Sequence, residues 1–233
     1  LYPDRIDLGL GRAPGTDPIT SNALRRTFND KTDYFPQEVV ELQNYLKIAK
    51  PNQNVIAIPG EGTNIPLYIL GSSLYGASLA ATLGLPFAFA SHFAPHYLLQ
   101  AIEIYKNNFV PSEQLKKPYL ILGFNVFGAE NIEEGEYLRT SSLQSYINLR
   151  KGKPGKLPPP KKNFYENISN EDKKLISGMT SCYSVGNCEN LKSGLREFID
   201  HTSANELILV SSIYDHEKRL NSYRVASEAI RKL

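Results

Sequence analysis

Short apolar runs alternate with stretches of helical periodicity along almost the whole of this chain. Runs typical of buried strands cover residues 5–12, 55–73, 85–93, 117–128 and 205–212, and a further short strand is expected within 180–187. The stretches that predict helices cover residues 36–49, 74–84, 95–109, 130–152, 188–202 and 215–233, with a glycine interruption in the fourth. A strand followed by a helix, repeated about five times, favours a parallel sheet with the helices packed outside it. The sequence therefore predicts an α/β fold.

Glycine and proline residues mark the expected turns, helix ends and loops in this pattern. The run 55–73 contains Gly60 and Gly62 and is expected to form two short strands about a turn, whereas Gly84 is expected to end the helix that precedes it. Residues 151–163 read KGKPGKLPPPKKN, and so many prolines exclude regular structure. We expect a solvated, mobile insertion loop there, over the strand ends. The alternative is a loop that holds an anionic ligand.

Composition bounds the class of protein. A length of 233 residues suits a single domain over residues 1–233, within range of an α/β barrel of about 250 residues. Hydrophobic residues make up 41% of the chain, which is enough for a substantial core. A net charge of +2 gives no reason to expect a nucleic-acid partner or attraction to a membrane. No apolar run approaches about 18 residues, so we expect a protein that is not in the membrane.

Several common kinds of site are disfavoured by spacing. Cys182 and Cys188 form neither a CxxC pair nor a disulfide framework, which indicates a reducing, cytoplasmic location. No HExxH, paired-cysteine or clustered carboxylate pattern predicts a metal, and no GxSxG turn predicts a serine hydrolase. Gly9, Gly11 and Gly15 lack the GxGxxG spacing of a dinucleotide-binding unit.

Polar residues follow the apolar runs at positions where α/β proteins place their sites. Ser72 and Ser73 end one run and open directly into a helix, whose first N–H groups and dipole attract an anion. Arg12 ends an earlier run and can close over the same anion with a bidentate contact. The alternatives are that Ser72 is only a helix cap and that Arg12 is only a surface ion pair. His92 ends a third run, where it acts as a hydrogen-bond donor or proton relay, or else packs at a helix entry.

Three stretches carry a resemblance to a known family. These are YPDRIDLGLGRAPGTD, IPLYILGSSLYGASLAATLGLPFAFASHFAP and NELILVSSIYDHEKRLNSY. They resemble the luciferase-like flavin-dependent monooxygenases, in the branch similar to alkanal monooxygenase, and the similarity runs along nearly the whole chain. The resemblance implies a TIM (β/α)8 barrel with an insertion, which would hold residues 151–163. It also implies that reduced FMN binds at the C-terminal mouth of the barrel and reacts there with O₂.

The resemblance assigns roles to individual residues. It implies that Arg12 pairs with the flavin phosphate and that Pro14 belongs to the same cofactor-binding region. Ser72 and Ser73 fall on the phosphate-binding strand end, and Gly76 falls on a nearby contact at the helix start. His92 falls on the strand end that faces the isoalloxazine region, which makes it the candidate catalytic residue.

The resemblance also bears on where the chain begins. The stretch IDLGLGR resembles the fourth barrel strand, so we expect the C-terminal five-eighths of a luciferase-like barrel, without the first three βα units. A piece of a larger gene product and a reduced barrel both fit this expectation. The resemblance places the family's catalytic histidine region and much of its dimer interface in the absent strands.

The first functional hypothesis is an FMN-dependent monooxygenase that uses reduced flavin and O₂ on a small, aldehyde-like substrate. A flavin reductase is then the expected supplier of FMNH₂, and a homodimer is the expected assembly. The second hypothesis is a non-catalytic flavin-binding or storage protein derived from the same fold. The third is a deazaflavin-dependent oxidoreductase on the same barrel.

Overall fold

A computed structural model of the chain describes residues 2, 5–12, 20, 23, 34–179 and 181–233. Its contacts divide the chain into two compact units. The first unit comprises Leu1–Ala88 and Glu103–Tyr119, and the second comprises Phe89–Ile102 and Leu120–Leu233. The organisation of the chain as a single domain stays a prediction.

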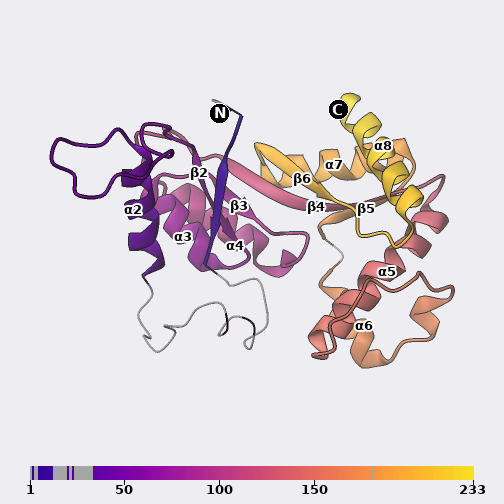
Figure 1. Cartoon of the computed structure of the whole chain (residues 1–233). Helices are drawn as coiled ribbons and strands as arrows, with labels where there is room; N and C mark the ends of the chain where they lie inside the picture. The colour runs from indigo at the N-terminus through magenta and orange to yellow at the C-terminus, as the bar shows by residue number, and fades with distance from the viewer. Residues whose placement is uncertain (1, 3–4, 13–19, 21–22, 24–33, 180) are drawn as a thin grey trace. The chain divides into compact units, whose positions relative to one another are not determined.

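The first unit is built around two parallel strands (Figure 1). Strand β1 (Leu8–Gly11) pairs with β2 (Leu67–Gly71), and the register sets Gly11 beside Leu70. Helix α2 (Phe35–Leu46) precedes β2 and begins with a proline in its first turn, where the missing N–H costs nothing. Helix α3 (Leu74–Leu83) follows β2 and packs against it.

Small residues let α3 lie close to β2. Ala77, Ala80 and Ala81 are fully buried on the helix. Gly84 ends the helix with φ +62°, a left-handed conformation that glycine adopts without a Cβ penalty, and its N–H binds the carbonyls of the last turn. The predicted helix end at Gly84 is therefore confirmed.

The chain passes from the first unit to the second within β3 (Phe87–Phe89), returns at Glu103 and enters the second unit again at Leu120. A short 3₁₀ turn (Pro95–Tyr97) and helix α4 (Leu98–Asn107) follow β3.

The second unit is built around the long strand β4 (Leu120–Gly128). β4 pairs in parallel with β5 (Tyr183–Gly186) and with β6 (Glu206–Val210). Asn125 faces Tyr183 on one side and Val210 on the other, so β4 is the central strand of this unit. All but one residue of β4 are buried, as a central parallel strand requires.

Four helices follow the start of β4 in the second unit, and three of them pack on β4 (Figure 1). They are α5 (Ile132–Arg150), α6 (Asn170–Ser177), α7 (Cys188–Thr202) and α8 (His216–Arg231). Helices α7 and α8 pack on each other, α8 also packs on β4, and α5 packs on β5, β4 and α6. Each of the four begins with a side-chain cap, from Asn131, Ser169, Asn187 and Asp215 respectively.

The structure departs from the sequence predictions at three elements. Residues 55–59 form no strand; they lead into a turn in which the N–H of Glu61 donates to Ala57, and the side chain of Ile58 is exposed rather than buried in a sheet. Gly135 does not interrupt α5. A Cβ there would come within 2.3 Å of Val185, so the glycine serves the close packing of α5 on β5. The third is helix α6, which the sequence analysis does not predict.

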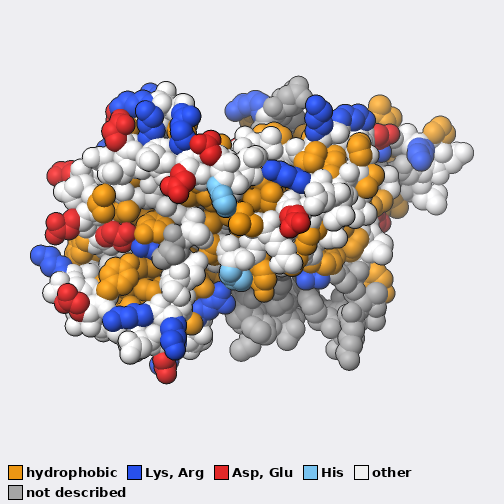
Figure 2. All heavy atoms as spheres, turned by 180° about the vertical axis from the view of Figure 1, so that it is seen from behind, with side chains coloured by type: hydrophobic (Ala, Val, Ile, Leu, Met, Phe, Trp, Pro, Cys, Tyr) orange, Lys and Arg blue, Asp and Glu red, His pale blue; other side chains and the backbone are white. Residues whose placement is uncertain are grey.

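The predicted α/β fold with parallel strands is confirmed, and residues 151–163 form no regular structure. The face in Figure 2 carries lysine and arginine side chains interspersed with acidic ones, without a block of one sign. Among the helices of the described residues, none combines the length and apolar character that a membrane span requires.

Candidate functional site

The first unit brings Arg12 to the start of α3. Arg12 follows β1 directly, and the parallel register of β1 with β2 sets it level with the end of β2. Its guanidinium carbon lies 3.9 Å from the centre of the Tyr75 ring, in the first turn of α3. This stacking holds an exposed cation beside a helix start. The arginine and the helix start, which the sequence analysis joined in one site, are therefore neighbours.

The turn between β2 and α3 has the properties of an anion site. Ser73 is the N-cap residue of α3, but its hydroxyl makes no capping hydrogen bond, and no acidic side chain stands in the first turn. Ser72 and Ser73 are both exposed. The first N–H groups of a helix and its positive dipole end attract anions. This turn therefore presents two hydroxyl groups, a helix start and a cation in one place.

Two glycines shape the same turn. Gly71 ends β2 and Gly76 lies in the first turns of α3, and a Cβ on either would lie 3.5 Å or less from the α-carbon of the other. A Cβ on Gly76 would also lie 3.2 Å from the Phe87 ring, which is tighter than ordinary contact. The glycines thus bring helix and strand together. The resemblance implies that Gly76 contacts the cofactor, which stays a prediction, whereas the structure gives Gly76 a packing role.

Pro14, the fifth predicted cofactor residue, lies outside the described residues. Tyr75 was missed by the sequence analysis. The signal available for it was an aromatic residue one position before Gly76, in the stretch that was already proposed to bind phosphate.

His92 belongs to the second unit and lies in the turn after β3. Its Nδ1 atom is buried and has no hydrogen-bond partner among the described residues. Burial lowers the pKa of the imidazole below its usual value, which favours the neutral ring at pH 7. The ring packs against Gly123 of β4 so closely that a Cβ there would lie 2.1 Å from Nδ1.

Two hydrogen bonds fix the backbone around His92. The Asn125 amide donates to the His92 carbonyl oxygen at 2.9 Å, and the Ser91 hydroxyl donates to the Gly123 carbonyl oxygen at 2.6 Å. Both bonds join the turn to β4. The backbone that carries the imidazole is therefore held against β4. The position of His92 relative to Arg12 stays a prediction.

A second polar cluster, missed by the sequence analysis, lies on α5. Arg139 is only 4% exposed, and its guanidinium pairs with Glu136 at 3.1 Å and stacks on the Tyr183 ring at 3.6 Å. The Tyr183 hydroxyl donates to Glu136 at 3.2 Å, and the Tyr165 hydroxyl lies 3.5 Å from the same carboxylate. Burial raises the pKa of both tyrosines, so they remain hydrogen-bond donors. Glu136 and Arg139 stand three residues apart on a helix, a spacing that predicts a side-chain pair.

Comparison with known proteins places the chain in a family. No model of a known protein family matches it. A protein of Escherichia coli strain K12 named luciferase-like monooxygenase is 44% identical to it over 233 residues, which cover 100% of this chain and 70% of that protein. The chain belongs to the luciferase-like monooxygenase family. The resemblance seen in the sequence is therefore confirmed, and the family is one of enzymes.

Solved structures agree with this assignment. The crystal structure of apo-MsnO8 has a TM-score of 0.86 and 31% identity, over 99% of this chain and 70% of that one. A type II Baeyer–Villiger monooxygenase from Pseudomonas putida, the oxygenating constituent of 3,6-diketocamphane monooxygenase in complex with FMN, has a TM-score of 0.55. At 15% identity over 94% of this chain and 70% of that one, it shows only that the fold is shared.

Proposed function

We propose that this chain is an FMN-dependent monooxygenase that oxygenates a small organic substrate of the aldehyde type. The observation that carries the proposal is the stacking of Arg12 on Tyr75, 3.9 Å from ring centre to guanidinium carbon, beside the start of α3. FMN carries a single terminal phosphate, and this turn offers a single anion site. The FMN-bound relative of the same fold gives the proposal its cofactor.

The residues of the turn fit a phosphate. The exposed Arg12 supplies a bidentate donor, and Ser72 and Ser73 supply exposed hydroxyl groups in the turn itself. Gly76 has no side chain to block the first turn of α3, where the backbone approaches the anion. A dinucleotide would need a second phosphate site with its own glycine-rich loop, and the spacing of Gly9 and Gly11 does not supply one. We therefore propose FMN over FAD or NAD.

Bound reduced flavin supplies two electrons to O₂, so that one oxygen atom enters the substrate and the other leaves as water. With an aldehyde the products are the carboxylic acid, oxidised FMN and water. The chain's own residues bind and orient the cofactor. Arg12 would neutralise the phosphate, and the Ser73 hydroxyl would donate a hydrogen bond to it. By the resemblance to the family, His92 is the proposed catalytic residue, and its neutral imidazole could serve as a hydrogen-bond donor.

Reduced FMN must come from elsewhere, because the proposed site holds one flavin and no nicotinamide. We propose a separate flavin reductase as its source, a cytoplasmic location where that reductase operates, and a homodimer as the assembly. The reductase and the homodimer are proposed from the resemblance to the family, and the cytoplasmic location from the spacing of Cys182 and Cys188.

The proposal is tested by turnover under a defined supply of reductant. Photoreduced FMN is mixed with the chain, oxygenated buffer and a series of linear alkanals, and O₂ uptake and carboxylic acid are measured. We expect acid formation that depends on the chain. Bound flavin without any product would identify the non-catalytic flavin-binding protein instead. Tighter binding of a deazaflavin than of FMN would identify the deazaflavin-dependent oxidoreductase.

A further inference from the structure

Asn125 is the only polar residue of the central strand β4 and the only residue of that strand that is not buried. Its amide nitrogen donates to the His92 carbonyl oxygen at 2.9 Å. Because a carbonyl oxygen can only accept, this bond also decides which end of the amide is nitrogen and which is oxygen. The turn after β3 therefore binds Nδ2 of Asn125 and leaves Oδ1 for another partner.

The amide oxygen of Asn125 is open to a ligand. Within the described part of the chain Oδ1 has no hydrogen-bond partner, and it does not belong to the buried polar atoms that lack one. The Ser91 hydroxyl of the same turn is instead fully buried and is bound to the Gly123 carbonyl oxygen. Asn125 therefore presents an accessible acceptor, on a rigid strand, to a group that carries an N–H or O–H donor.

The surface beside Asn125 is apolar. In the register of β4 with β6, Asn125 lies beside Val210 and Gly123 lies beside Ile208. Residues two apart on a strand, and residues paired between parallel strands, project from the same face of the sheet. The Ile208 side chain on this face is 51% exposed, and Val210 is partly buried. The amide of Asn125 therefore lies at the border of an accessible apolar surface on β6.

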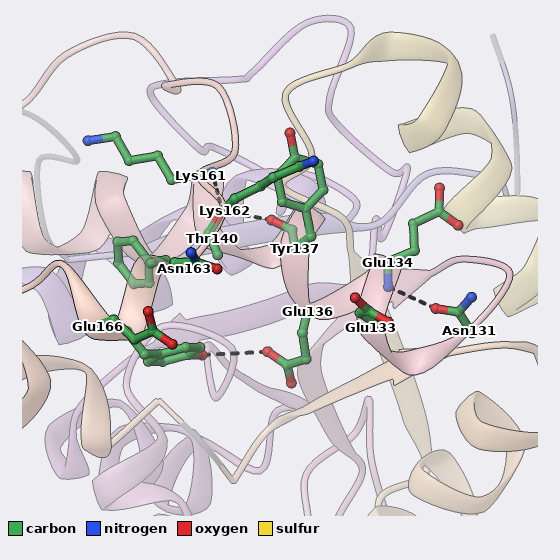
Figure 3. A pocket seen from close by; sticks show the side chains of 12 residues that line it. Asn131, Glu133, Glu134, Glu136, Tyr137, Thr140, Lys161, Lys162, Asn163 and Glu166 are labelled. Atoms are coloured by element: carbon green, nitrogen blue, oxygen red, sulfur yellow. Dashed lines mark hydrogen bonds between the residues drawn. The ribbon is translucent and has the colours of Figure 1, made fainter.

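Tyr183, the neighbour of Asn125 on β5, is already engaged. Its hydroxyl donates to Glu136 at 3.2 Å, and its ring is covered by the Arg139 guanidinium. Figure 3 shows the Glu136 carboxylate with its hydrogen bond to the Tyr165 hydroxyl. Tyr183 thus belongs to the polar cluster of α5, whereas the acceptor of Asn125 remains free for a ligand.

We propose that Asn125 binds the ring system of the flavin, and that its Oδ1 accepts a hydrogen bond from the N3–H group of that ring. The inference rests on the proposed function, in which FMN is the cofactor. Oxidised and reduced flavin both carry N3–H, whereas an aldehyde offers only a carbonyl acceptor and leaves Oδ1 unsatisfied. The apolar surface at Ile208 suits the flat, largely apolar face of the flavin.

A comparison of FMN with 3-methyl-FMN tests the proposal on the full chain. The analogue carries a methyl group in place of the N3 hydrogen and keeps the phosphate, so any contribution of Arg12 is the same for both. We expect quenching of flavin fluorescence to show FMN bound about tenfold more tightly, because the analogue cannot donate to Oδ1. Equal affinities would overturn the role of Asn125 and leave FMN as the cofactor. Binding of neither flavin would overturn the proposed function, and this inference with it.

Variants assign the preference to the Asn125 oxygen. Asn125→Leu keeps the volume of the side chain and Asn125→Ala leaves space, and both remove the acceptor. We expect the preference for FMN over 3-methyl-FMN to fall from about tenfold to less than about twofold in each, through weaker binding of FMN.

The matched control is Ser91→Ala, which removes the other hydrogen bond between the turn and β4 and keeps Oδ1 in place. Both affinities can fall in this variant, but the tenfold preference should persist. A preference that persists in both Asn125 variants would show that another group reads N3–H. Loss of the preference in Ser91→Ala would show that the turn, rather than the amide oxygen, causes it. Either result would overturn the assignment.

Discussion

At the scale of single residues, this chain uses glycine to make room for functional side chains. Gly123 sits in the middle of β4, where a residue with a side chain is otherwise expected, and the His92 ring occupies the space of the missing Cβ. Gly71 and Gly76 instead make room for each other's backbone and for the Phe87 ring, between β2 and α3. At Gly123 the absence of a side chain therefore decides where a neighbouring polar residue can lie.

Replacement of Gly123 should therefore disturb His92 directly. In Gly123→Ala the new methyl group would lie 2.1 Å from Nδ1, so the ring must leave its place. We expect a loss of about 1–3 kcal/mol in the free energy of unfolding, the usual cost of overpacking a core. Urea unfolding measures it. The control is Gly178→Ala, because a Cβ there meets no atom within 4 Å and φ is −73°. Equal stability of the two variants would contradict the packing described for His92.

The lowered pKa of His92 makes stability depend on pH. Because the folded chain holds His92 neutral below the usual pKa of about 6.5, the unfolded chain binds more protons as the pH falls through that value. Stability attributable to His92 is thus complete above pH ~6.5 and declines as the pH falls toward the folded pKa.

The comparison that isolates this effect is between the native chain and His92→Gln. Urea unfolding at several pH values from ~7.5 down to ~5 should show a decline in the native chain that is weaker in the variant. The other three histidines are exposed and contribute equally to both proteins. Parallel curves would show that the imidazole is not desolvated in the folded state.

At the scale of elements, helix α5 joins the strands of the second unit to the proline-rich loop. It packs on β4 and β5 through Gly135, anchors the proline-rich loop through Thr140 and Gln144, and carries the buried Arg139. The helix therefore holds the segment 151–179 in place.

Substitution of Arg139 tests whether the polar cluster on α5 stabilises this part of the fold. Arg139→Met leaves the Glu136 carboxylate without its cation in a half-buried site, and we expect a loss of about 3 kcal/mol in the free energy of unfolding. The control is Lys173→Met on the exposed side of α6, which removes the same charge and should change stability by less than about 0.5 kcal/mol. A loss in Arg139→Met no greater than in the control would mean that the cluster does not hold the loop.

Elements with a strong local pattern were predictable from the sequence, and elements defined by tertiary contacts were not. Helix α7 was predicted at its observed bounds because its apolar stripe and its cap at Asn187 are both local signals. Residues 55–59 look like a strand but find no partner strand, and Gly135 looks like a helix break until Val185 is placed beside it. Arg12 and Ser73 were predicted as neighbours because both follow parallel strands. The contact between Gln144 and Pro159 brings the proline-rich loop back onto α5, and no short sequence pattern predicts such a contact.

At the scale of the whole molecule, membership of the luciferase-like monooxygenase family rests on identity along the full chain, 44% over 233 residues. The family fixes the fold and the class of enzyme. The proposal that FMN is the cofactor is based instead on a few residues of the first unit, in particular Arg12 beside the start of α3. The central claim is that these residues bind the phosphate of FMN.

The most direct test compares FMN with riboflavin, which has the same ring system but no phosphate. Affinities of both for the native chain and for Arg12→Ala are measured by quenching of flavin fluorescence, with Arg5→Ala as a control arginine of the same unit. We predict that Arg12→Ala weakens FMN by about 30-fold, or ~2 kcal/mol, and leaves riboflavin unchanged. Equal loss of FMN and riboflavin, or no loss of FMN, would contradict the claim that Arg12 binds the phosphate.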